Sequence, residues 1–191
     1  QMEITTIRIS TVAFKSNSES AGQSRWKFTG LSAGLRKLGV VKGLKDFDIL
    51  VDAEGVCDPS ELPEMESTDH LGFHVDVLRR VMAYRHFPAM LKKIHEGCTE
   101  LLKRGVKEQL EILVVCPNGQ RLSVAIATLL QHCLSTCRHK KINVVPCIRH
   151  LSKGYWPEPH LESCPSCKNP DKQPDLKGAL DQAPCWIHVS Q

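Results

Sequence analysis

The chain has 191 residues, of which 41% are hydrophobic and 24% are charged, and its formal net charge is +4. This composition is typical of a soluble globular protein with a sizeable core, and it argues against a strongly basic nucleic-acid binder. No run of about 18 apolar residues occurs, so we expect no membrane span.

The nine cysteines are an odd number for a disulfide framework. The first residues, QMEITTIRIS, lack the basic start and long apolar block of a signal peptide. We therefore expect reduced thiols and a cytoplasmic or nuclear protein.

The apolar pattern predicts strands over residues 4–14 and 47–55, followed by two helices. The first helix is expected over residues 74–85, where His74 and His86 would be surface residues. Gaps of three and four between apolar residues predict the second amphipathic helix. The residues of its apolar face are Phe87, Leu91, Ile94, Cys98 and Leu101.

The clearest unit is a strand over 111–115, a loop CPNGQ over 116–120, a helix from Leu122 and a strand over 141–150. Two parallel strands joined by a helix form a βαβ unit. Pro146 indicates an edge position or a bulge in the second strand. We therefore predict an α/β domain over residues 1–152, with a mixed, partly parallel sheet and flanking helices.

Several pieces of the chain occur in a recognisable order. A strand with Phe14-Lys15 precedes LRKLGVVKGLKDFDILVDAEG, and CPNGQRLSV and INVVPCIRHL follow. Over roughly four-fifths of the chain this order resembles the C-terminal domain of the RNase adapter protein RapZ, the YvcJ family. The matching positions are Asp52, Asp58, Pro59, Cys116, Gly119, Gln120, Ser123, Val124 and Arg149.

The resemblance implies binding of an amino-sugar phosphate, presentation of small RNA to a ribonuclease, and oligomerisation. Pro117-Asn118 and Arg121-Leu122 stand where the family has Thr-Gly and His-Arg. The family's nucleotide-binding half is not expected here, since no G-x-x-x-x-G-K-[ST] motif occurs. We therefore expect neither ATP nor GTP as a cofactor.

The strand-loop-helix unit is the first candidate site. A helix N-terminus offers N–H groups and a partial positive charge to an anion. The side chains and glycine that could hold a phosphorylated small molecule or an RNA phosphate are Gly119, Gln120, Arg121, Ser123 and Arg149. Pro117 removes one donor, and the simpler interpretation is a plain turn in which Ser123 starts the helix.

The C-terminal segment, residues 153–191, is rich in proline and polar residues, and we expect a tail outside the core. It contains a C-x2-C pair and a C-x2-H pair, a spacing that suits tetrahedral zinc. The predicted ligands of this zinc-ribbon-like tail are Cys164, Cys167, Cys185 and His188. The alternatives are thiols without metal in a disordered tail, or a redox pair formed by Cys164 and Cys167.

Together these patterns favour a non-catalytic binding or adapter module that holds a phosphorylated small molecule or RNA phosphate. The alternative is a protein-interaction scaffold with a degenerate pocket and a structural zinc tail, with a protein partner or a second copy of the chain. A third hypothesis is an enzyme that uses Cys116 on phosphate esters. The phosphatase pattern C-x5-R fails, because Leu122 stands at the arginine position.

Overall fold

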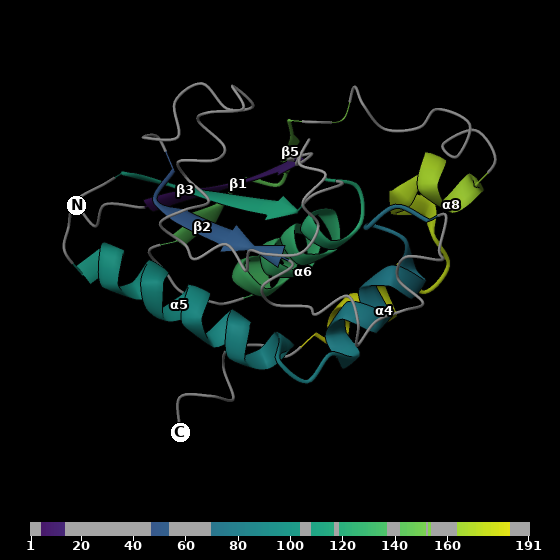
Figure 1. Ribbon diagram of the computed structural model, residues 1–191, viewed down its shortest axis with the longest axis horizontal. Coiled ribbons are helices and arrows are strands. Elements are labelled where there is room, and N and C mark those ends of the chain that lie inside the picture. Colours follow the sequence, from purple (N-terminus) through teal and green to yellow (C-terminus); the bar gives the residue numbers. More distant parts are fainter. Residues whose placement is uncertain are drawn as a thin grey trace, which may run out of the picture.

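A five-stranded parallel sheet forms the centre of the protein (Figure 1). The computed structural model describes residues 5–13, 47–53, 70–103, 108–116, 119–136, 142–151, 153 and 164–183. The strands are β1 (Thr5–Ala13), β2 (Ile49–Asp52), β3 (Gln109–Cys116), β4 (Ile142–Val144) and β5 (Arg149–His150). Their order is β2-β3-β1-β4, and β5 also pairs with β1. All pairings among the described strands are parallel, so the α/β prediction is confirmed.

The predicted strand over 141–150 is divided into two short strands, β4 and β5, with Pro146 between them. Both pair with β1, on the side opposite β3. The amide of Val145 still donates to the carbonyl of Ile7 at 2.9 Å. Proline has no N–H for a strand ladder, which explains the interruption at this edge of the sheet.

Helices α5 (Phe87–Lys103) and α6 (Leu122–Thr136) cover one face of the sheet, and α4 (Val75–Ala83) packs against these two helices (Figure 1). Their positions confirm the predicted helices to within a few residues. The C-terminal segment adds α8 (Pro165–Lys168), a 3-10 turn η4 (Pro170–Lys172) and α9 (Leu176–Asp181).

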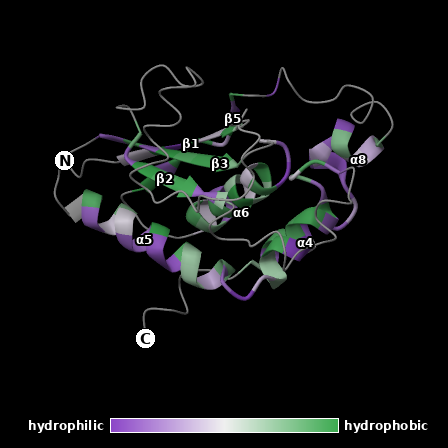
Figure 2. Ribbon diagram, in the orientation of Figure 1, coloured by the Kyte–Doolittle hydropathy of each residue, from purple (hydrophilic) through white to green (hydrophobic). Residues whose placement is uncertain are grey.

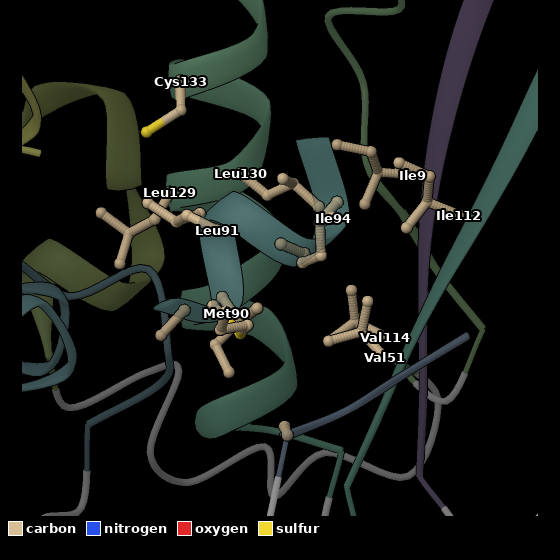
Figure 3. Packing of buried hydrophobic residues seen from close by; sticks show 14 of the residues in the cluster. Ile9, Val51, Met90, Leu91, Ile94, Ile112, Val114, Leu129, Leu130 and Cys133 are labelled. Atoms are coloured by element: carbon tan, nitrogen blue, oxygen red, sulfur yellow. The ribbon is translucent and has the colours of Figure 1, made fainter. Parts of the chain in front are cut away.

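The main core lies between the sheet and these helices (Figure 3). Alternate strand residues, such as Ile9, Ile112 and Val114, point toward α5 and α6 because side chains alternate across a strand. Helix α5 contributes Leu91 and Ile94, as its apolar spacing predicts. Hydrophobic residues dominate the central strands and α6, whereas α5 is hydrophilic along much of its length (Figure 2).

The described part of the predicted tail packs against this same core. Ala183 is 4% exposed and belongs to the main cluster, and Leu176 and Leu180 pack against it. Arg79 of α4 forms an ion pair with Asp175. Residues 164–183 are therefore joined to the α/β domain by both apolar and polar contacts.

Gly72 marks a close approach between the segment before α4 and the start of α6. A Cβ at this position would lie 2.1 Å from the carbonyl oxygen of Arg121 and 2.5 Å from the backbone nitrogen of Ala125. The amide of Gly72 donates to the carbonyl of Gln120 at 2.9 Å. These contacts leave room for glycine alone.

We expect Gly72→Ala to destabilise the protein by about 1–3 kcal/mol, because the new methyl group must displace backbone atoms. Urea unfolding followed by circular dichroism measures the change. Gly97→Ala is the matched control, since its Cβ would meet only Ile49 Cδ1, at 3.6 Å. The control is expected to be neutral or to stabilise by up to about 1 kcal/mol, because alanine favours a helix. Equal effects of the two substitutions would contradict the close approach.

No helix within the described ranges is long and apolar enough to cross a membrane. The longest, α5, has 17 residues and carries charged side chains along one face.

Candidate metal centre

The segment before α4 supplies two histidines to the candidate site. His74 is the N-cap of α4, and its Nδ1 accepts a hydrogen bond from the amide of Asp76 at 3.3 Å. A metal would therefore be bound by His74 through Nε2. His70 lies in the same segment, before His74. The two imidazole rings stack, with their centroids 3.7 Å apart and an interplanar angle of 5°.

Helix α8 supplies two cysteines from the other end of the chain. Cys164 is the N-cap of α8 and Cys167 lies within it, so one tight turn carries both thiols. The amide of Leu71 donates to Cys167 Sγ at 3.4 Å, which joins α8 to the histidine segment. Cys167 is 2% exposed and Cys164 is partly exposed.

The side chains of Cys164, Cys167 and His74 lie around His70. Its Nδ1 lies 3.5 Å from Cys164 Sγ and 3.9 Å from Cys167 Sγ. The possible ligand atoms of His70, His74 and Cys164 all lie within 4.8 Å of one another. These three residues form a group that could hold a metal ion, and Cys167 borders it.

The spacing agrees with tetrahedral zinc. Bond lengths of about 2.3 Å to sulfur and 2.0–2.1 Å to nitrogen place neighbouring ligand atoms about 3.6 Å apart. The observed nitrogen–sulfur separations of 3.5 and 3.9 Å are close to that value. His70 and the two cysteines are thus nearly in position before a metal enters. The parallel rings of His70 and His74 must tilt for both to bind one ion, because the lone pair of an imidazole nitrogen lies in the plane of its ring.

The site disfavours the thiolate of Cys167 until a cation is present. Burial raises the pKa of the Cys167 thiol to about 11, the Leu71 amide lowers it, and contact with Cys164 raises it. A bound metal reverses this preference because it deprotonates a coordinating thiol. The Leu71 N–H group would then donate to a thiolate, a stronger acceptor than a thiol.

Of the predicted ligands, Cys164 belongs to this group and Cys167 borders it. Cys185 and His188 lie outside the described residues. The expectation that His74 lies on the surface is wrong, because His74 is 8% exposed and caps α4. The spacing of His70 and His74, H-x3-H, was the signal that could have found them.

The strand-loop-helix unit lies against the metal centre. Gly119 adopts φ 59° beside Ala13, and its amide donates to Cys116 Sγ at 3.1 Å. The Cys116 thiol in turn donates to Ser123 Oγ at 3.2 Å, and Ser123 is fully buried. The Gly119 amide and the Ser123 hydroxyl, both expected to face a phosphate, thus contact Cys116 inside the fold.

Arg149 is directed to a different place. Its guanidinium donates to Glu111 at 2.8 Å and to Ser10 Oγ at 3.1 Å. Ser10 lies three residues before Ala13 on β1, and Ala13 is the residue that contacts Gly119. The two described contacts of Arg149 therefore hold it along the sheet, away from the loop. The backbone carbonyl of Gln120 accepts a hydrogen bond from the amide of Gly72, and the carbonyl of Arg121 accepts one from the amide of Ala125.

The fold and site together define an α/β protein with a His- and Cys-rich candidate metal centre between its core and its C-terminal segment. No protein-family model, curated protein or solved structure matches this chain.

Proposed function

We propose that this protein is a non-catalytic interaction module in which one structural zinc ion fastens the C-terminal segment to the α/β domain. The ligands are His70, His74, Cys164 and Cys167. The observation that carries the proposal is the convergence of both thiols on His70 Nδ1, at 3.5 and 3.9 Å, from a position more than ninety residues away in the chain.

Zinc is favoured by the chemistry of the ligands. Two thiols and two imidazoles are the Cys2His2 set of many structural zinc sites, and softer ligands of this kind disfavour magnesium and calcium. Four protein ligands complete a tetrahedral shell and leave no position for a catalytic water. The hydrogen bond from Asp76 to His74 Nδ1 orients the ring, as outer contacts of zinc ligands commonly do.

The partner that this architecture favours is another protein. The loop expected to hold an oxyanion uses the Gly119 amide and the Ser123 hydroxyl in contacts with Cys116. Arg149 engages Glu111 instead.

A reducing compartment, the cytoplasm or the nucleus, suits the site, and no disulfide joins the cysteines that the structure describes.

Metal analysis of the purified full chain tests the proposal. We expect about one zinc per chain, retained through gel filtration. Zinc should fall at least tenfold in His70→Ala and in Cys167→Ser, because each removes a ligand. It should be unchanged in the double variant Cys185→Ser, His188→Ala. Loss of zinc in that double variant, with zinc retained in His70→Ala, would instead support the ligand set that the tail spacing indicated.

A pair of titrations separates the protein-binding proposal from phosphate binding. Thermal stability should be insensitive to millimolar amino-sugar phosphate and inorganic phosphate, since a ligand of the native state would raise it. Binding to RNA that weakens steeply with added salt would contradict the proposal and favour phosphate contacts.

A further inference from the structure

The two thiols of the metal centre differ in exposure, although they lie on one turn. Cys164 is partly exposed at the start of α8, whereas Cys167 is buried beneath it. Both sulfurs lie beside the same atom, His70 Nδ1, at 3.5 Å for Cys164 and 3.9 Å for Cys167. An oxidant from solvent would therefore meet Cys164 first, with a second sulfur already beside it.

Other cysteines in the described part of the chain lack this combination. Burial, with the charge of Asp48, raises the pKa of Cys98 to about 12, so this residue remains an unreactive thiol. Cys133 is fully buried within α6. Cys147 is exposed but belongs to no cluster of possible metal ligands among the described residues.

We propose that the metal centre is a peroxide-sensitive switch, in which a hydroperoxide converts Cys164 and Cys167 into a disulfide and expels zinc. The inference rests on the proposed zinc site, because zinc is what keeps both sulfurs as thiolates at neutral pH. Thiolates are the reactive form toward peroxide.

The chemistry balances in two steps. The Cys164 thiolate attacks one peroxide oxygen, so that an S–O bond forms, the O–O bond breaks and the second oxygen leaves as water after taking a proton. The Cys167 thiolate then attacks the Cys164 sulfur, forming the S–S bond and releasing hydroxide, which also takes a proton. Two thiolates thus supply the two electrons, and zinc loses half of its ligands.

The structural change is expected to be local. The Leu71 amide contacts Cys167 Sγ directly, and both sulfurs contact His70, so the contacts between α8 and the histidine segment are made by the sulfurs that oxidation alters. Helix α9 has separate attachments, because Arg79 pairs with Asp175 and Ala183 lies in the main core. Oxidation would release α8 while α9 stays docked.

The test treats the zinc-loaded full chain with hydrogen peroxide and follows zinc release with a colorimetric chelator. We expect one zinc released for each Cys164–Cys167 disulfide found by peptide mass mapping, and reversal by dithiothreitol with added zinc. Hydrogen exchange should quicken at Leu71 and Lys168 and stay unchanged at Ala183. Cys147→Ser should behave as the unaltered chain does.

A second variant separates oxidation from loss of the metal. Cys164→His keeps four possible zinc ligands but removes one sulfur, so peroxide should release its zinc at least tenfold more slowly. Zinc release without the Cys164–Cys167 disulfide, or retention of zinc by the unaltered chain in excess peroxide, would overturn the switch alone. A purified chain that contains no zinc before oxidation would overturn the proposed function as well.

Discussion

Removal of zinc is expected to lower the thermal midpoint of this protein by about 8–16 °C. With free zinc at 1,000 times its dissociation constant, binding stabilises the native state by about 4.1 kcal/mol. For a chain of this size, each kcal/mol shifts the midpoint by about 2–4 °C. Thermal melts with and without an excess of a strong chelator measure the difference.

A matched pair of variants ties this effect to the centre. His70→Ala should melt at the chelated midpoint and should no longer respond to chelator. Cys147→Ser, which alters an exposed thiol elsewhere, should respond as the unaltered chain does. A chelator effect that survives in His70→Ala would place the metal at another site.

Loss of Gln173 is expected to destabilise the protein by about 2 kcal/mol. This side chain accepts a hydrogen bond from the Val75 amide at 2.9 Å and donates to the Phe73 carbonyl at 2.8 Å. It is 7% exposed. In Gln173→Ala two partly buried backbone groups lose this bond, and the loss of partners at such groups costs about 1–3 kcal/mol.

Urea unfolding of the zinc-saturated protein measures this change independently of the metal. Gln182→Ala is the control, because Gln182 is exposed and should tolerate alanine within about 0.5 kcal/mol. A neutral effect of Gln173→Ala would indicate that residues 164–183 contribute little to the stability of the domain. The prediction thus tests whether this segment is an integral part of the fold.

Much of the secondary structure could be predicted because it follows local periodicity. The apolar run within β3 and the three- and four-residue gaps of α5 indicated a strand and a helix at nearly the observed positions. Pro146 correctly marked an edge strand or bulge, since a missing N–H is a local property. The order β2-β3-β1-β4 could not be deduced, because it depends on which strands pack together.

The cysteines of the candidate metal centre were predicted from the sequence in the same way, whereas its histidines were not. A C-x2-C pair on one turn is a local pattern, and it identified Cys164 and Cys167. Their partners were sought nearby in the tail, at Cys185 and His188, because a single sequence offers spacing but no distances. His70, which the structure brings beside these thiols, lies 94 residues from Cys164 and 97 residues from Cys167 along the chain.

By itself, the sequence determined where the main helices and strands lie to within a few residues, and that one turn carries two thiols suited to zinc. The tertiary structure decided what those thiols face. Gly72 lets the segment that carries His70 and His74 lie against the start of α6. Ala183 is buried in the main core, which holds the C-terminal segment, and with it α8, beside His70. Periodicity along a chain reports contacts between neighbours in sequence, whereas a metal centre depends on packing between segments that are far apart in it.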